Sequence, residues 1–171
     1  MAFVFKSNVK RNVLDCKAVD ERICVLRIKT RSQNASLIIV HAPTEEKEEL
    51  EKKAFYQKVE EIYDSRPCND IKIVLGDWKA KVGREELYQG VTGRHSIHLN
   101  TNNNGQSLVD FAAAENMVVS STSFPYREIH KQTWRSPVGK ANNEIDHILI
   151  YKRKASSMLD VKSQAATLTT F

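Results

Sequence analysis

A short apolar run in the middle of the chain, residues 71–75, places the strongest limit on the fold. An apolar strand of this length that follows a helical segment is typical of the centre of a sheet covered on both faces. The run ends at Gly76-Asp77, which puts a carboxylate where a buried strand meets a loop. Functional groups concentrate at such junctions, but Asp is also a common turn residue. Both a catalytic and a structural role therefore stay open for Asp77.

Further strands and two helices are predicted around this central strand. Segments rich in β-branched and aromatic residues predict strands at 3–5, 12–18, 23–29, 36–41, 117–120, 133–135, 145–150 and 158–162. Thr44 with two glutamates after it indicates the start of a helix that ends near Pro67. Apolar spacing predicts a second helix over 105–116, with Asn102, Asn103 and Asn104 as candidate caps. Strands in runs with two helices between them favour an α/β (α+β) fold of two packed sheets with helices outside.

The size and composition of the chain predict one folded domain over residues 1–171. Apolar residues make up 41% and charged residues 27%, which excludes a disordered or fibrous chain. No leader-like segment and no apolar run of membrane-spanning length appears, so an intracellular, soluble protein is expected, with nucleus or cytoplasm left open. The chain begins directly with strand-like residues, which suggests that the domain is cut at its N-terminus.

The charge balance and the positions of the cysteines say little about which ligands the chain binds. A net charge of +5 and a pI near 9.1 are compatible with a polyanionic partner, and equally with ordinary surface charge. Cys16, Cys24 and Cys68 lie far apart and form none of the short pairs of zinc or redox sites. Buried free thiols are the expected state of these residues.

A second acid, Asp146, occupies an apolar strand beside His147. An unpaired carboxylate would be costly there, so a partner is required. The carboxylate could pair with a structural donor, orient a histidine general base, or contribute to a phosphate site that holds a metal. His41 also ends a predicted strand, where a histidine is more often a hydrogen-bonded edge residue than a ligand.

One loop combines side chains that suit contact with nucleic acid. Trp134 and Arg135 begin it, a Gly-Lys pair follows, and Asn143 ends it just before the strand of Asp146. An aromatic ring can stack on a base, and cations and amides can bind phosphates. A Trp before a strand is equally often a core residue, so the structural alternative stays open.

Four motifs in order resemble the endonuclease/exonuclease/phosphatase superfamily. They are His41-Ala42-Pro43-Thr44, Gly76-Asp77-Trp78-Lys79-Ala80-Lys81-Val82-Gly83, the segment from Trp134 to Gly139, and Asn143-Glu144-Ile145-Asp146-His147. The match resembles most the endonuclease domains of RTE-type non-LTR retrotransposons and the craniofacial development protein 2-like proteins. It spans nearly the whole chain.

The resemblance implies a four-layered sandwich of two mainly antiparallel sheets flanked by helices, incomplete here at both ends. It also implies that the protein binds Mg²⁺ and cleaves phosphodiester bonds in DNA. A monomer is expected. Asp77 matches the acid of a Gly-Asp-Phe-Asn motif that is proposed to position or deprotonate the attacking water, and it is also the expected metal ligand. Asp146 matches the acid that orients the catalytic histidine. His41 stands where many relatives carry a Tyr that contacts the phosphate. Lys79, Trp134 and Asn143 are the expected substrate-binding residues.

The chain also departs from the family pattern. Lys79 replaces the Asn of the motif, and an ammonium can only donate hydrogen bonds. The family's metal-binding Glu precedes the first residue of this chain, and its Ser-Asp-His motif follows the last. His147 cannot replace that histidine, because its neighbour on the strand points to the opposite face.

Three expectations follow from these matches and departures. The first is that the chain is part of a Mg²⁺-dependent DNA endonuclease domain and is weak or inactive alone. The second is a non-catalytic nucleic-acid-binding remnant of the fold. The third is a fragment that folds poorly, because a sheet that loses strands exposes its edges.

Overall fold

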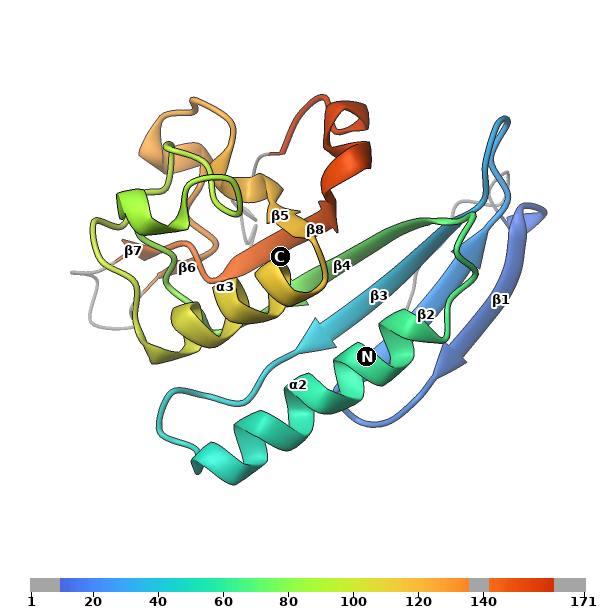
Figure 1. Cartoon of the computed structure of the whole chain (residues 1–171), viewed down its shortest axis with the longest axis horizontal. Helices are drawn as coiled ribbons and strands as arrows, with labels where there is room; N and C mark the ends of the chain where they lie inside the picture. The colour runs from blue at the N-terminus through green and yellow to red at the C-terminus, as the bar shows by residue number, and fades with distance from the viewer. Residues whose placement is uncertain (1–9, 136–141, 162–171) are drawn as a thin grey trace, which may run out of the picture.

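The computed structural model of the chain describes residues 10–135 and 142–161, so the strand predicted at 3–5 lies outside the described residues. Its centre is a six-stranded sheet (Figure 1). In spatial order the strands are β1 (Val13–Ala18), β2 (Ile23–Ile28), β3 (Ala35–His41), β4 (Ile71–Asp77), β8 (Asp146–Tyr151) and β5 (Met117–Val119). Every neighbouring pair is antiparallel except β3 and β4, which are parallel. The apolar run at 71–75 is therefore a central strand, as predicted. The predicted cover on both faces is not seen among the described residues, because only Val74 of this run is buried.

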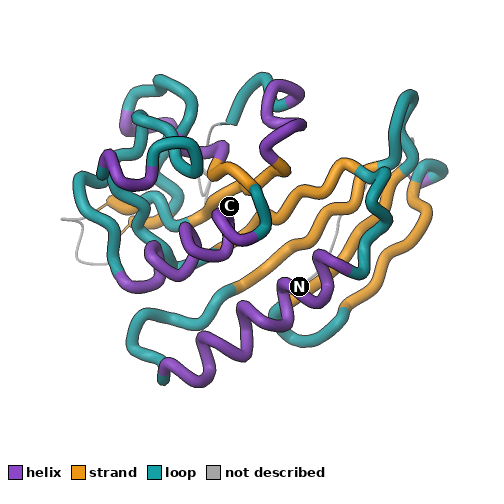
Figure 2. The backbone as a smooth tube through the Cα atoms, viewed as in Figure 1, coloured by secondary structure: helices purple, strands orange, loops and turns teal. Residues whose placement is uncertain are grey.

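Two helices cover one face of this sheet (Figure 2). Helix α2 (Glu49–Asp64) connects the parallel strands β3 and β4, and helix α3 (Asn103–Ala114) precedes β5. Residues 10–135 and 142–161 also include the ribbon of β6 (Trp134–Arg135) and β7 (Asn142–Asn143) and the 3₁₀ turns η1 (Glu86–Tyr88), η2 (Ser120–Thr122), η3 (Glu128–His130) and η4 (Lys152–Ser157). The predicted α/β class is confirmed. Of the four expected layers, the described residues supply one large sheet and one helical layer.

Three local predictions were wrong. The strand predicted at 158–162 is irregular over 158–161, where the side chain of Leu159 is 87% exposed and has no apolar surface to pack on. Cys24 is buried as expected, whereas Cys16 and Cys68 are exposed. Helix α2 begins at Glu49 instead of near Thr44, because a turn closes from the amide of Lys47 to the carbonyl of Thr44. No helix among the described residues is long and apolar enough to cross a membrane.

The core between the helices and the sheet centres on Trp78, whose side chain is fully buried. The rings of Phe55, Tyr56 and Phe111 lie 6.3, 6.0 and 6.0 Å from it between centroids. Its indole Nε1 donates a hydrogen bond of 3.2 Å to the carbonyl oxygen of His147 on β8. Burial of an aromatic side chain of this size is a large apolar contribution. The residue directly after Asp77 is therefore fixed in the core.

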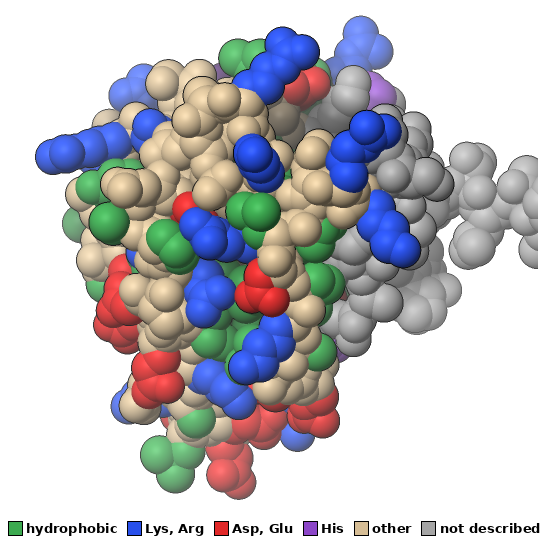
Figure 3. Space-filling model, turned by 90° about the vertical axis from the view of Figure 1, so that its right-hand side faces the viewer, with side chains coloured by type: hydrophobic (Ala, Val, Ile, Leu, Met, Phe, Trp, Pro, Cys, Tyr) green, Lys and Arg blue, Asp and Glu red, His purple; other side chains and the backbone are tan. Residues whose placement is uncertain are grey.

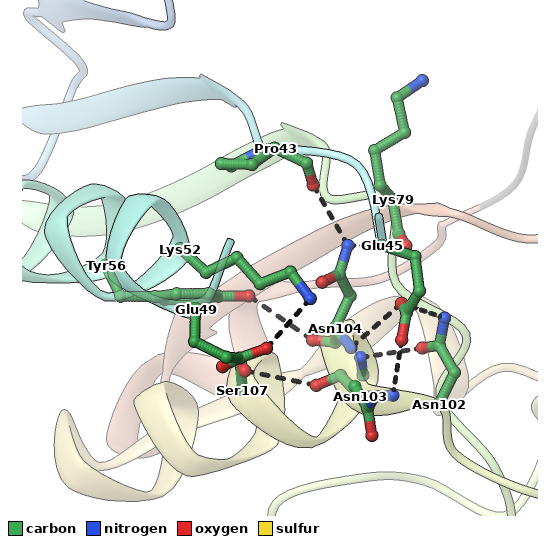
Figure 4. Close-up of polar contacts among 11 residues, drawn as sticks. Pro43, Glu45, Glu49, Lys52, Tyr56, Lys79, Asn102, Asn103, Asn104 and Ser107 are labelled. Atoms are coloured by element: carbon green, nitrogen blue, oxygen red, sulfur yellow. Dashed lines mark hydrogen bonds and ion pairs between the residues drawn. The ribbon is translucent and has the colours of Figure 1, made fainter. Parts of the chain in front are cut away.

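The N-terminus of α3 binds the two loops that follow β3 and β4 (Figure 4). The carboxylate of Glu45 accepts hydrogen bonds from the side chain of Asn102 and from the backbone amides of Asn103 and Asn104. These amides have no partner within the helix, so a carboxylate is favourable here. Because Glu45 caps α3, its segment is not available to start α2. The predicted cap is confirmed as well, since Asn102 Oδ1 accepts from the amide of Gly105 at 2.8 Å.

The amide group of Asn104 joins the two loops directly. Its Nδ2 donates to the carbonyl of Pro43 at 3.1 Å and to the carbonyl of Lys79 at 3.2 Å, and the residue is only 3% exposed. Pro43 lies two residues after the end of β3, and Lys79 lies two residues after the end of β4. One buried side chain therefore holds both strand ends in a fixed relation.

A close approach of β3 and β4 requires glycine at position 76. Gly76 has a φ of +142°, and a Cβ atom there would lie 2.0 Å from the carbonyl oxygen of Val40 on β3.

We expect Gly76→Ala to lower the free energy of unfolding by at least about 3 kcal/mol, through backbone strain and the clash together. Urea denaturation measures this, with Gly90→Ala as the control. Gly90 also has a positive φ, of +94°, but its nearest atom is the mobile Nζ of Lys152 at 3.5 Å, so we expect a loss of about 1–2 kcal/mol. Equal losses in the two variants would contradict the close approach.

The loop contacts of Asn104 lead to a second prediction. Asn104→Ala removes the donor to two carbonyl groups, and we expect it to lower the free energy of unfolding by about 2–4 kcal/mol. Ser107→Ala on the same helix is the control, because Ser107 bonds only the carbonyl of Asn103 in the hydrogen bonds described and should change stability by no more than about 0.5 kcal/mol. Thermal denaturation of both variants measures the difference, and a small loss in Asn104→Ala would show that the loops do not depend on this side chain.

Candidate functional site

Three predicted site residues form a row at one end of the sheet. His41 ends β3, Asp77 ends β4 and Asp146 begins β8. His41 is opposite Asp77 in the parallel pairing, and Asp77 is opposite Asp146 in the antiparallel pairing. Side chains at paired positions project from the same face of a sheet. Residues separated by more than 35 positions in the sequence thus come together across three adjacent strands.

The row lies on the face of the sheet that the two helices do not cover. The neighbouring row, with Val40 and His147, projects into the core on the helix side, and successive residues of a strand alternate between faces. His41 is exposed, while Asp77 and Asp146 are partly buried. The site is therefore open to solvent and supported from behind by the core.

Two side chains meet at one oxygen of Asp77. Its Oδ2 forms an ion pair with the ammonium of Lys79, and the Nε2 of His41 lies 3.8 Å from the same oxygen. The second oxygen, Oδ1, accepts a hydrogen bond of 3.1 Å from the backbone amide of Lys79. Lys79 is one of the expected substrate-binding residues. In the structure its ammonium forms an ion pair with Asp77.

Asp146 is held by Thr133, which precedes β6. The Thr133 hydroxyl oxygen accepts hydrogen bonds from the backbone amides of Ile145, at 3.0 Å, and of Asp146, at 3.2 Å. Burial raises the pKa of Asp146, and the negative charge of Asp77 raises it further, against a lowering by the hydrogen bond with Thr133 and by the charges of Lys79 and His41. A carboxyl group of this kind takes up a proton more readily than an exposed Asp.

The other two predicted substrate-binding residues face one another next to this acid. Trp134 on β6 is paired with Asn143 on β7, and the amide of Thr133 donates to the carbonyl of Asn143 at 2.9 Å. The Trp134 residue is 39% exposed, so it is not a core residue, in contrast to Trp78. The part of this loop at 136–141 lies outside the described residues.

His147 is a core residue and is separate from the row, as the strand alternation predicted. It is 1% exposed, its Nε2 lies 2.9 Å from the carbonyl oxygen of Ala80, and its Nδ1 lies 2.8 Å from the hydroxyl of Ser121. A carbonyl can only accept, so the neutral ring carries its proton on Nε2 and accepts from Ser121 at Nδ1. Burial lowers the pKa of His147 to about 4.

Sequence reasoning missed two buried ionisable side chains, Glu144 and Lys131. Glu144 and Lys131 are each 3% exposed, and among the described residues the Oε2 of Glu144 has no hydrogen-bond partner. Burial raises the pKa of Glu144 to about 7, although the positive charge of Lys131 opposes this. Both residues line a cavity of about 250 Å³ together with Thr133 and Asp146. Nothing in the local sequence distinguishes these residues from ordinary surface charges.

The donor set at the row is compatible with a divalent cation of the Mg²⁺ type. No group of three His, Cys, Asp or Glu that could hold a metal ion occurs in the part of the chain that the structure describes. Mg²⁺ is often held by one or two carboxylates and completes its shell with water and substrate phosphates. Asp77 and Asp146 fit this pattern, since they are paired across two strands and the charge of one raises the pKa of the other.

The buried imidazole of His147 predicts a loss of stability in acid. Between its ordinary pKa of 6.5 and about 4, the unfolded chain binds a proton at this residue and the folded chain does not. The free energy of unfolding should therefore fall as the pH decreases through this window, by on the order of 3 kcal/mol from this residue. Urea denaturation at several pH values measures it. Because carboxylates titrate in the same range, His147→Gln is the control, and its profile should be shallower between pH 6.5 and 4. Parallel profiles would contradict a neutral buried His147.

Comparison with known proteins agrees with the motifs. No family model matches the chain. The chain is 31% identical over 164 residues to craniofacial development protein 2 of Tragulus javanicus and 30% identical to that of Bos taurus. These alignments cover 96% of this chain but 28% and 27% of the relatives, so the chain spans just over a quarter of their length.

Two solved structures share the fold. The endonuclease domain of TRAS1, a telomere-specific non-LTR retrotransposon, matches with a TM-score of 0.50 and 12% identity over 77% of this chain and 49% of that chain. TDP2 of D. rerio, complexed with a single strand DNA product, matches with a TM-score of 0.54 and 12% identity over 82% and 53%. The chain is thus similar to craniofacial development protein 2 along nearly its whole length and shares its α/β fold with these two structures, in agreement with the resemblance to the endonuclease/exonuclease/phosphatase superfamily.

Proposed function

We propose that this chain is part of a Mg²⁺-dependent DNA endonuclease domain of retrotransposon type, and that alone it cleaves DNA weakly or not at all. The observation that carries the proposal is the row of His41, Asp77 and Asp146 on the uncovered face of the sheet. Its support is the similarity to craniofacial development protein 2 and a fold shared with the TRAS1 endonuclease domain.

Each residue of the row has a role that suits phosphodiester hydrolysis. Asp77, at the end of a rigid strand, can accept a hydrogen bond from the attacking water and orient it. Asp146, paired with Asp77 across the two strands, supplies the second carboxylate of the row. The exposed imidazole of His41 can donate a hydrogen bond to a phosphate oxygen. Asp77 and Asp146 would hold Mg²⁺, which when bound neutralises charge on the phosphate and on the leaving oxygen.

Contact with DNA is supported by the ribbon and by the distribution of charge. The exposed Trp134 can stack on a base, and Asn143 beside it can donate to a base or a phosphate. Helix α2 carries five acidic residues and three lysines, and α3 carries one acid and no cation. In Figure 3, Lys and Arg side chains are spread over the middle and upper part of the face, while Asp and Glu gather toward the lower edge. The excess positive charge of the chain therefore lies outside these two helices.

Weak cleavage follows from the state of Asp77. Its carboxylate is already paired with Lys79 and lies near His41, so it is less available to water or to a metal ion. The same observation favours a second function, a nucleic-acid-binding module without catalysis. Cleavage separates the two, because both require binding to DNA.

DNA binding and nicking by the whole chain test the proposal. We expect the anisotropy of labelled single- and double-stranded oligonucleotides to report binding that weakens roughly tenfold between 50 and 200 mM salt, as for about two phosphate contacts. Plasmid with Mg²⁺ should be nicked slowly, and Asp77→Asn should abolish the nicking without weakening the binding. Asp110→Asn on α3 is the control, since this acid is exposed and lies outside the row.

Each other outcome has a definite meaning. Binding without any nicking, with wild type equal to Asp77→Asn, would favour the non-catalytic module. Rapid nicking that Asp77→Asn abolishes would contradict the weak activity of the separate chain. Absence of binding at 50 mM salt would contradict both functions.

A further inference from the structure

The ammonium of Lys79 lies where a metal ion bound to the row would have to contact Asp77. It is paired with Oδ2, the oxygen that His41 also approaches. The side chains of Lys79 and Asp77 are 26% and 27% exposed, so the ion pair is partly shielded from solvent. A half-shielded pair is stronger than one on an open surface.

The backbone, rather than side-chain flexibility alone, directs this ammonium. Lys79 has a φ of 51°, in the left-handed region that Lys rarely adopts. Its amide donates to Asp77 Oδ1, and its carbonyl accepts from the buried Asn104. The residues on either side, Trp78 and Ala80, are fully buried. A conformation fixed at so many points places the Lys79 side chain on the row.

Figure 4 shows the consequence of this turn for the side chain. The carbonyl of Lys79 points toward the asparagines of α3, and the aliphatic chain extends away from them. The hydrogen bond from Asn104 therefore fixes the backbone of Lys79, while its ammonium remains free to pair with Asp77. Asn104 is a positioning residue in this arrangement, because it acts on the row through Lys79.

We propose that Lys79 is a tethered counter-cation of Asp77 that competes with a divalent cation for the Asp77–Asp146 pair. The inference rests on the proposed function, which names this pair as the metal-binding carboxylates. An ammonium and a divalent ion repel one another and cannot both occupy one carboxylate oxygen. Affinity for the divalent ion is therefore lower than the two carboxylates would provide without Lys79.

Substitutions at position 79 separate charge from backbone conformation. Lys79→Asn removes the charge, and Asn tolerates a positive φ better than most residues. Lys79→Gly also removes the charge and adopts this φ without strain, so it serves if the Asn variant folds poorly. Lys79→Arg keeps a cation and is the matched control.

Binding of Mn²⁺ to the whole chain tests the proposal without reference to catalysis. Electron paramagnetic resonance of free Mn²⁺ gives the dissociation constant, and added Mg²⁺ tests whether both ions use one site. We expect Lys79→Asn and Lys79→Gly to bind Mn²⁺ about two- to fivefold more tightly than the wild type, as for the loss of one competing ion pair. Lys79→Arg should bind like the wild type, and adding Asp77→Asn to Lys79→Asn should remove the gain.

Two results would overturn the inference, and they differ in what they say of the proposed function. If wild type and Lys79→Asn bind Mn²⁺ equally and both lose it with Asp77→Asn, Lys79 does not compete, while the proposed metal pair stands. If no variant shows binding that depends on Asp77, the inference and the proposed metal pair fail together. Thermal denaturation of each variant confirms that the comparison is between folded proteins.

Discussion

The parallel pairing of β3 with β4 is the constraint on which the rest of the structure depends. It brings His41 beside Asp77, and with the antiparallel pairing to β8 it adds Asp146 to the row. The close approach leaves no room for a Cβ at Gly76, and the same position gives the strand end its shape. Helix α2 spans the crossover and covers the face behind the row. The site is thus a direct product of strand order, because three distant segments meet only when the strands pair in this register.

The support behind the row comes from two kinds of contact with different physics. Trp78 fixes the segment after Asp77 by burial among aromatic rings, which is strong but has little directional preference. Asn104 and Glu45 fix the loops by hydrogen bonds, which are individually modest but specify geometry. The first contact holds the chain against the core, and the second sets the backbone angle at Lys79. Together they determine where a charged side chain meets a candidate catalytic acid.

The electrostatics of the row is a balance between two acids, the ammonium of Lys79 and the imidazole of His41. Burial and the neighbouring charge raise the pKa of Asp146, while Lys79 and His41 compensate the charge of Asp77. The ammonium serves the folded chain, because an acid pair without a counter-charge would destabilise the sheet end. The same ammonium opposes a second cation. The ion pair at Asp77 Oδ2 therefore stabilises the separate chain and at the same time lowers its affinity for a metal ion.

The sequence by itself determined the central strand, both helices, the α/β class and the separation of His147 from Asp146, because these follow from apolar periodicity and strand alternation over short segments. Its motifs also named His41, Asp77 and Asp146 before their contacts were known. It placed the start of α2 too early and missed the burial of Glu144 and Lys131, since both depend on partners distant in the sequence. Only the tertiary structure decided that Lys79 lies on Asp77 and that Asn104 holds its backbone. Strand register and loop packing are long-range effects, and no local pattern of residues specifies them.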